Sequence, residues 1–226
     1  LNENGAILHY QLRERVAPTD SRTFLIDAGA MVAGYASDIT RTYLADGAKA
    51  SPFAALLEAM DALQLALCAQ VTPGCAYVDL HLDCHHRLGE VLRASGILHG
   101  LSAEAAVASG ITRTFFPHGL GHFLGLQVHD VAGFQHAPQG DRVAPPQEHP
   151  FLRLTRTLQA NEVVTIEAGL YFIPMLLATL RASEAGQHVD WSLVDALTPY
   201  GGIRIEDDVV ATAHGPRNLT REAFAA

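Results

Sequence analysis

The stretch TFLIDAGAMVAGYASDITRTYL, residues 23–44, contains two runs of strand-forming residues separated by small residues that suit a turn. Because β-branched and aromatic residues favour extended backbone, we expect strands over residues 23–28 and 32–44, with the turn near residues 30–33. A further strand is expected at residues 6–12, AILHYQL. The first part of the chain is therefore predicted to form a sheet.

Helices are expected after these strands. Ser51 and Pro52 have the pattern of a helix N-terminus, and apolar residues then recur at helical spacing as far as Val71. A second helix is predicted from residue 78 to residue 94, and a short alanine-rich one at residues 103–108. Both long segments have an apolar side that could cover a sheet.

The second half of the sequence returns to extended structure. Residues 111–129 carry glycine every few positions and predict irregular extended backbone, and residues 130–150, with four prolines, predict a long loop. Strands are expected again at residues 162–172 and 203–211. Strands near both ends with helices between them predict an α+β fold over residues 1–226 rather than alternating β-α-β units.

The composition excludes several classes of protein. With 49% hydrophobic and 17% charged residues among 226, the chain can build a sizeable core. A net charge of −9 repels phosphate backbones and anionic lipids, so nucleic acid and membranes are poor partners. No uncharged apolar run approaches the roughly 18–20 residues of a membrane span. The three cysteines form no C-x-x-C pair, which fits reduced thiols and a cytoplasmic location.

Two aspartates lie at corresponding places in the first predicted hairpin. If its centre falls between Val32 and Ala33, Asp27 and Asp38 face each other across the strands. Like charges at such a short distance destabilise a sheet, and ionised carboxylates in apolar surroundings are costly unless they are paired or bind a metal. We therefore expect them to bind a divalent cation, with a turn-rim Asp and a capping Asp as the alternative.

Two glutamates occur in the last predicted strands. Glu167 lies in a strand that should be largely buried, and strand alternation places Arg204 and Glu206 on one face, opposite the neighbouring isoleucines. An ion pair between Arg204 and an acid within the sheet is the alternative for Glu206. Asp207 and Asp208 are expected to be solvated.

The segment HGLGHFLGLQVHD, residues 118–130, concentrates histidines among glycines. His118 and His122 are four apart, as zinc ligands on a helix are, but the intervening glycines argue against a helix. In extended backbone the two would lie about 13 Å apart, so at most one of them should bind a given metal, and the other histidines of the segment would line a pocket. Eight other histidines have no such context and are predicted to be structural or surface residues: His81, His85, His86, His99, His136, His149, His188 and His214.

This donor set indicates a particular kind of metal site. Imidazole with carboxylates suits Mn, Fe, Co or Zn, and a set rich in carboxylates favours Mn(II). Four carboxylates and one imidazole would suit two ions about 3.5–4 Å apart with a shared water, the arrangement of hydrolytic centres. The spacing alone thus predicts a dinuclear metallohydrolase.

Four blocks, IDAGA with GYASDITRT, HGLGHFLGLQVHD, TIEAGLYF and GGIRIEDDV, together resemble the pita-bread metallopeptidases. The likeness is greatest to their Xaa-Pro dipeptidase (prolidase) and aminopeptidase P branch, and LNENGAILHY and VAGF fit bacterial Xaa-Pro dipeptidases. The resemblance implies a pseudo-twofold α+β domain with the site between its halves. It also implies that a metal-bridging hydroxide hydrolyses the Xaa-Pro bond of dipeptides, and that the full-length form is a homodimer.

The resemblance also implies roles for individual residues. Asp27, Asp38, His122, Glu167 and Glu206 would hold two Mn(II)-type ions, although Co, Zn or Fe could replace manganese. Asp38 and Glu206 would bridge the ions, Asp27 would complete the shell of one, and His122 with Glu167 that of the other. Glu167 would also transfer protons.

Further residues match the family outside the ligand set. His118 and His129 match histidines that hold the substrate or the developing oxyanion, and Arg204 matches an arginine beside the bridging acids. One departure is Ala168, which stands where the family usually has proline between Glu and Gly. Loss of the fixed proline φ affects the rigidity of the strand and not the ligand itself.

Two other readings remain open from the sequence. Prolidases have an N-terminal domain of comparable size, which we expect to be absent from this chain, and the length fits a single-domain exopeptidase related to methionine aminopeptidase. A metal-free binding module on the same fold is the other alternative, although all five ligand positions are filled. Hydrolysis of organophosphate triesters would be compatible with such a site.

Overall fold

A computed structural model describes residues 1–9, 15–16, 18–136 and 139–226. Its main sheet is antiparallel, with the strand order β1, β4, β6, β5, and β7 pairs with the end of β6. These strands are β1 (Thr23–Ala28), β4 (Ile39–Leu44), β5 (Val163–Tyr171), β6 (Gly202–Val210) and β7 (Arg217–Asn218). A separate two-stranded ribbon is formed by β2 (Met31–Val32) and β3 (Tyr35–Ala36).

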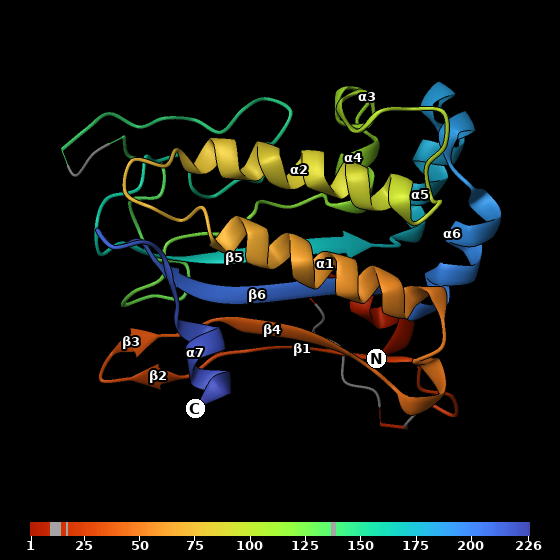
Figure 1. Ribbon diagram of the computed structural model, residues 1–226, viewed down its shortest axis with the longest axis horizontal. Coiled ribbons are helices and arrows are strands. Elements are labelled where there is room, and N and C mark those ends of the chain that lie inside the picture. The colour runs from red at the N-terminus through yellow and green to blue at the C-terminus, as the bar shows by residue number, and fades with distance from the viewer. Residues whose placement is uncertain (10–14, 17, 137–138) are drawn as a thin grey trace.

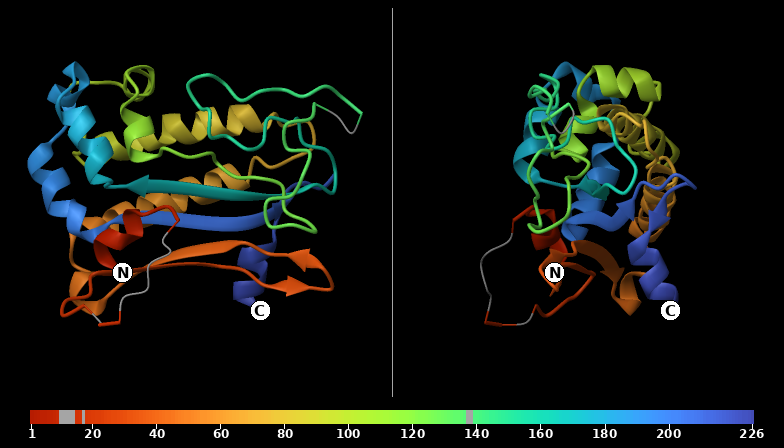
Figure 2. Two further views of the ribbon diagram at one scale, coloured as in Figure 1. Left: turned by 180° about the vertical axis from the view of Figure 1, so that it is seen from behind. Right: turned by 90° about the vertical axis from the view of Figure 1, so that its left-hand side faces the viewer.

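Helices cover one face of this sheet (Figure 1). The two long helices, α1 (Pro52–Cys68) and α2 (Tyr77–Ala94), lie side by side, and α1 packs directly on β5 and β6. Turning the molecule shows the loop that follows Phe116 on the opposite side of the sheet (Figure 2). The shorter helices are α3 (Ala103–Ala108), α4 (Ile111–Phe115), α5 (Pro174–Arg181), α6 (Trp191–Leu197) and α7 (Leu219–Ala225).

The core lies between the long helices and the sheet. The apolar side of α1 that the sequence predicts is buried, including Phe53, Met60 and Leu67. It packs with the apolar side of β5 and β6, where Ile166 and Ile205 are also buried. Because side chains alternate along a strand, the residues next to these isoleucines in sequence, Glu167 in β5 and Glu206 in β6, face away from α1. That opposite face carries the candidate site.

The predicted α+β arrangement is confirmed, with four local corrections. The strand expected at residues 6–12 is wrong for its described part: Asn2–Ala6 is a 3₁₀ helix, and residues 10–12 lie outside the described residues. The Asn2 side chain accepts hydrogen bonds from the backbone N–H groups of Arg22 and Thr23, which folds this segment against the start of β1. Short 3₁₀ helices also occur at Asp46–Ala48, Glu184–His188 and Thr198–Tyr200.

The first hairpin differs from its predicted register. Ala33 and Gly34 both have positive φ, 52° and 84°, so they form the two central residues of the turn. The centre therefore lies one residue later than expected, and Asp27 pairs with Thr40 instead of Asp38. The single strand expected over residues 32–44 is divided into β3 and β4, with Ser37 and Asp38 outside the ladder.

The segment 111–129, for which the sequence predicts extended backbone, begins with a short helix, α4. Ile111 and Phe115 are four apart and both buried, so one turn of α4 covers them, and Gly110 precedes the helix with φ 81°. From Phe116 to Asp130 the described backbone is irregular, as the glycines predict.

Asp207 and Asp208, expected to be solvated, are both buried. Asp207 faces the helices, where the guanidinium groups of Arg41 and Arg221 contact its carboxylate. These cations outweigh the effect of burial and lower the pKa of Asp207. Burial raises the pKa of Asp208 to about 7, and its carboxylate accepts a hydrogen bond from the backbone N–H of Asp38. Long-range partners that local sequence does not reveal therefore hold both acids inside.

Candidate metal centre

Three acidic residues form one row across the sheet. In the observed register Asp27 of β1 pairs with Thr40 of β4, Thr40 with Glu206 of β6, and Glu206 with Glu167 of β5. Directly paired residues project from the same face of a sheet, so the row presents three carboxylates around the Thr40 hydroxyl. That hydroxyl donates to Glu206 Oε2 at 2.7 Å.

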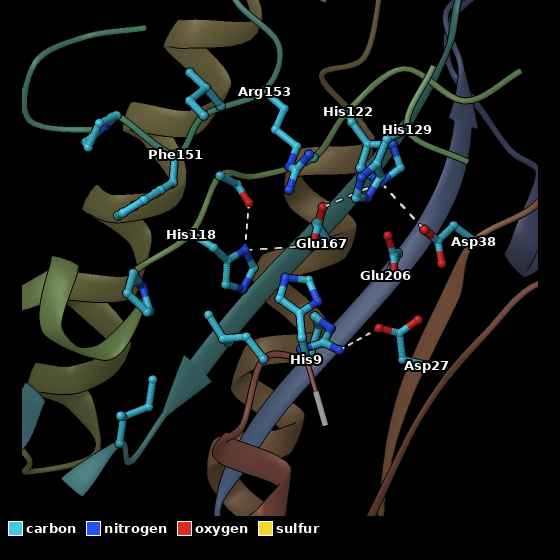
Figure 3. A pocket seen from close by; sticks show the side chains of 18 of the residues that line it. His9, Asp27, Asp38, His118, His122, His129, Phe151, Arg153, Glu167 and Glu206 are labelled. Atoms are coloured by element: carbon cyan, nitrogen blue, oxygen red, sulfur yellow. Dashed lines mark hydrogen bonds and ion pairs between the residues drawn. The ribbon is translucent and has the colours of Figure 1, made fainter. Parts of the chain in front are cut away.

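Asp38 reaches the same place from outside the ladder. Oxygens of Asp27, Asp38 and Glu206 lie within 4.8 Å of one another, and so do donor atoms of His122, Glu167 and Glu206. Figure 3 shows these five side chains around a common space. Glu206, only 2% exposed, belongs to both groups and lies between them.

The segment around His122 runs along the free edge of β5. The N–H of Thr165 donates to His122 O, and the N–H of Glu167 donates to Leu120 O. Gly121 permits this approach, because a Cβ there would lie 2.2 Å from Thr165 O. The sheet thus positions His122 as firmly as the acids.

The His122 ring is oriented for ligation. Its Nδ1 lies 2.9 Å from the carbonyl of Phe123, so Nδ1 holds the proton and donates it there. Nε2 then points its lone pair at the carboxylates, 3.6 Å from Asp38 Oδ2 and 3.8 Å from Glu167 Oε1. Burial alone would lower the pKa of His122, but the adjacent carboxylates of Asp38 and Glu167 raise it.

Crowding of the acids has a clear electrostatic effect. Burial raises the pKa of Glu206 well above its usual value, and neighbouring Glu167 and Asp38 add to the shift. Burial likewise raises the pKa of Glu167 to about 7, against the opposing effects of His122 and Arg204. A divalent cation would balance these charges, and oxygen donors with one imidazole are the ligands such a cation prefers.

His118 differs from His122 in having both ring nitrogens engaged. Nδ1 lies 2.8 Å from Gly119 O, and Nε2 lies 2.7 Å from the Tyr171 hydroxyl. Burial lowers the pKa of His118 to about 3, so the ring is neutral, with one nitrogen donating and the other accepting. His118 therefore borders the site without a lone pair free for a metal.

His129 is exposed at the edge of the site. Its ring centroid lies 4.1 Å from that of His122, and partial desolvation together with the neighbouring His122 lowers the pKa of His129 to about 4. Its nitrogen also lies within 4.8 Å of donor atoms of Asp38 and His122. Distance alone thus leaves both a ligand and a substrate role open for His129.

Arg204 forms an ion pair within the sheet, as the alternative interpretation of the β6 strand predicts, and its partner is Asp27 rather than Glu206. Its guanidinium donates to Asp27 Oδ2 at 2.7 Å and to the Tyr171 hydroxyl at 3.1 Å. The charge of Asp27 is thereby partly balanced, while among the described residues the Glu206 carboxylate accepts a hydrogen bond only from the Thr40 hydroxyl.

The site opens into a cavity of about 620 Å³ whose walls include residues that the sequence reasoning missed. His9, Phe151 and Arg153 line it, and the side chains of His9 and Arg153 point toward the acids in Figure 3. His9 lies in the LNENGAILHY block, so that block could have indicated it. Phe151 and Arg153 follow a long loop and carry no local signal.

Comparison with known proteins places this geometry in a family. The sequence profile of metallopeptidase family M24 matches residues 1–213. The chain belongs to this family. The Xaa-Pro dipeptidase of Xanthomonas axonopodis pv. citri (strain 306) is 54% identical to this M24 chain over 226 residues, which are 100% of the chain and 51% of that protein.

Solved M24-like structures agree with the fold. A histidine-to-alanine variant of Escherichia coli aminopeptidase P matches 98% of this chain with a TM-score of 0.73 at 31% identity. A zinc-substituted form of that enzyme in complex with product matches with a TM-score of 0.72, also at 31% identity. Each match covers 42% of the solved chain. This M24 chain thus spans about half the length of the dipeptidase it matches and less than half the length of the solved aminopeptidase.

The raised pKa of Glu167 gives a prediction for the metal-free chain. Because the folded state binds the proton more tightly than the unfolded state, this group stabilises the fold below about pH 4.5, and the contribution disappears as pH rises through about 7. Glu167→Gln, which imitates the protonated form, should therefore gain roughly 2–3 kcal/mol relative to wild type between pH 5 and pH 8. Urea unfolding of both chelator-treated proteins at the two pH values measures this, and a constant difference would contradict it.

Proposed function

We propose that this chain is the catalytic part of an Xaa-Pro dipeptidase that uses two divalent metal ions. The single observation that carries the proposal is the position of Glu206, buried between two groups of donors that it shares. The 54% identity to an Xaa-Pro dipeptidase along the whole chain supports the substrate class. One ion would bind to Asp27, Asp38 and Glu206, and the other to His122, Glu167 and Glu206, with Asp38 as a second bridge.

The donor set supports Mn(II) as the native metal, with Co, Zn or Fe as substitutes. Four carboxylates and one imidazole form a hard, oxygen-rich site. A relative whose solved structure is described as zinc-substituted indicates that this kind of site accepts other ions. Bound metal would supply an acidified water and polarise the scissile carbonyl.

The chain's own residues would perform the remaining steps. Glu167 would accept a proton from the attacking water and pass it to the leaving imino nitrogen of proline. His129 would hold the substrate carbonyl or the developing oxyanion, and His118 would join it by exchanging its contact with the Gly119 carbonyl for one with the substrate. Arg204 would position Asp27 through their 2.7 Å contact.

Arg153 would set the preference for dipeptides. It lines the cavity near His129, and no ion pair involves it among the described residues. A dipeptide differs from a longer peptide by a free carboxylate directly after proline, and a guanidinium binds a carboxylate in bidentate fashion. The free Arg153 side chain would therefore recognise the end of the substrate.

Arg153→Ala should lower kcat/KM for an Xaa-Pro dipeptide by roughly 10–100-fold, mainly through KM, since a hydrogen bond to a charged group contributes about 1.5–3 kcal/mol. The same variant should lose its preference for the dipeptide over its C-terminal amide. Arg142→Ala is the matched control, because Arg142 stacks on Phe134 in the same loop region. If both variants keep the preference for the free carboxylate, this role of Arg153 is wrong.

Metal removal tests the shared site directly. Stripping the ions leaves four acids crowded together, while metal that binds only the folded state stabilises it by about 2.7 kcal/mol at a hundredfold excess over Kd. For a chain of this size, chelator should lower Tm by roughly 5–10 °C, and Mn(II) should restore it. Elemental analysis should give two manganese ions per chain, and Glu206→Gln should bind fewer. An unchanged Tm after confirmed metal loss would exclude a shared site.

The setting of the chain is also part of the proposal. Residues 1–226 would form the catalytic domain, with the relatives' remaining half contributing to the pocket and to a homodimer. Among the described residues no helix is long and apolar enough to cross a membrane. The cysteines Cys68, Cys75 and Cys84 are free, which supports a cytoplasmic location.

A further inference from the structure

A second cluster of histidines lies inside the protein, away from the acids. His81 and His85 occupy successive turns on one side of α2, and His149 meets them from the end of the long loop. Their ring centroids are 4.5–4.7 Å apart. All three are buried, and His81 is only 1% exposed.

The cluster contains nitrogens without a partner. Both ring nitrogens of His81 and Nε2 of His85 are buried and have no hydrogen bond in the described structure. Buried polar atoms are normally satisfied by protein, water or an ion, so three unsatisfied nitrogens in one place indicate a missing partner.

The protonation of the rings is suited to metal binding. Burial lowers the pKa of His81 to about 2 and that of His85 to about 3, and burial also lowers the pKa of His149. The rings are therefore neutral and offer lone pairs. One nitrogen from each ring lies within 4.8 Å of the others.

We propose that His81, His85 and His149 bind one zinc(II) ion, independently of the carboxylate centre. Three imidazoles and a water complete a tetrahedral site, for which Zn–N distances of about 2.0–2.1 Å require ring shifts of the order of 1 Å. His85 Nδ1 lies 3.0 Å from the Thr112 hydroxyl, a contact that fixes this ring with Nε2 directed into the cluster. A neighbouring cavity of about 500 Å³, lined by His149, gives an entry path.

The new site is separate from the acids but adjoins the same pocket. The centroid of the Phe116 ring lies 5.2 Å from that of His85 and 4.7 Å from that of His118. Phe116 therefore lies between the histidine cluster and the cavity of the carboxylate centre. An ion held by His149 would fasten the loop to α2. Phe151 and Arg153 follow directly along the chain and line the catalytic cavity. The zinc would therefore stabilise one wall of that cavity.

The test is zinc binding by the metal-stripped chain, with zinc chloride as the only added metal. A weak competing chelator suppresses binding by single exposed histidines, and zinc is counted by elemental analysis after gel filtration. His149→Asn should bind one equivalent less than wild type, with the dissociation constant of that equivalent raised at least about 100-fold. His86→Asn is the matched control on α2, because His86 instead pairs with exposed Glu104, and it should match wild type.

A second measurement separates this site from the proposed catalytic centre. In His122→Asn the carboxylate centre should lose zinc, while the equivalent that depends on His149 should remain. Imidazole ¹H–¹⁵N spectra of His122→Asn should show zinc-dependent shifts for His81, His85 and His149, and when His149→Asn is added the His81 and His85 signals should no longer respond to zinc. If His149→Asn binds as much zinc as wild type, or if the three rings do not respond, the cluster holds no metal. That result would leave the proposal for the carboxylate centre intact.

Discussion

Replacing His122 by alanine is expected to remove metal and hydrolysis together. Its Nε2 faces Asp38 and Glu167 at 3.6 and 3.8 Å, and its Nδ1 is already engaged with Phe123 O. The variant would leave one ion without its imidazole ligand. We expect metal occupancy to fall below two ions per chain and kcat/KM to fall by at least about 100-fold, since even the partners of ligands contribute 10–100-fold.

His129→Ala is the matched comparison, because its ring packs against His122 yet is exposed at the edge of the cavity. A substrate-binding role predicts nearly normal metal content with a reduced rate of hydrolysis. Elemental analysis and kcat/KM are measured on both variants under the same metal supply. If His129→Ala loses metal and His122→Ala retains it, the assignment of His122 as ligand and His129 as substrate-binding residue is reversed. Both outcomes are physically open, because both rings lie close to Asp38.

Local pattern was sufficient to predict the helices and strands that carry the site. The apolar spacing along α1 and α2 and the β-rich runs of β5 and β6 each depend on neighbouring residues, so single segments reveal them. Alternation in β6 also placed Arg204 and Glu206 on one face, and their contacts with Asp27 and Thr40 agree with that. The same alternation directs Asp207 toward α1, where Gln64 approaches its carboxylate.

Register was harder to predict, because one residue in a turn changes every pairing. The sequence offered several small residues between the first two strands, and only the positive φ of Ala33 and Gly34 decides the centre. Asp27 and Asp38 still converge, although by a different route: Asp27 lies in the row through Thr40, and Asp38 is held outside the ladder by Asp208. The convergence was thus predicted through an incorrect pairing.

Contacts between distant segments could not be obtained from local pattern at all. His149 lies 64 residues after His85, and nothing near either residue indicates that they meet. Arg153 and Phe151 likewise enter the cavity at the end of a long loop. Asp207 was misjudged for the same reason, since its cations Arg41 and Arg221 come from β4 and α7.

Ala168 illustrates a local departure that the structure accommodates. Its backbone N–H donates to Gln64 Oε1 at 3.2 Å, and Gln64 Nε2 donates to Ile166 O. Proline, which the family usually has here, could not make the first bond. The α1 side chain thus braces the strand beside Glu167, which offsets the loss of a rigid proline.

The last prediction concerns substrate hydrolysis, and it follows from the fact that this chain spans about half the length of the Xaa-Pro dipeptidase it matches. The five proposed ligands all lie between residues 27 and 206, so the carboxylate centre of this chain should bind its two metal ions without the relatives' other half. Phe151 and Met175, however, line the cavity while remaining 68% and 75% exposed. An apolar rim of this kind is typical of a surface that another domain or subunit covers. When the rim is uncovered, it favours self-association of the chain.

A dipeptide offers few atoms for binding, so its orientation depends on walls that close around both charged ends. A displacement of about 1 Å at the reacting bond can cost about a hundredfold in rate. We therefore expect this 226-residue chain to match a full-length form in metal stoichiometry, yet to have a kcat/KM for an Xaa-Pro dipeptide lower by about two orders of magnitude. Both quantities are measured on both lengths, with sedimentation to detect self-association of the shorter one. Equal kcat/KM values would show that these residues alone close the pocket, and would remove the role assigned to the additional domain.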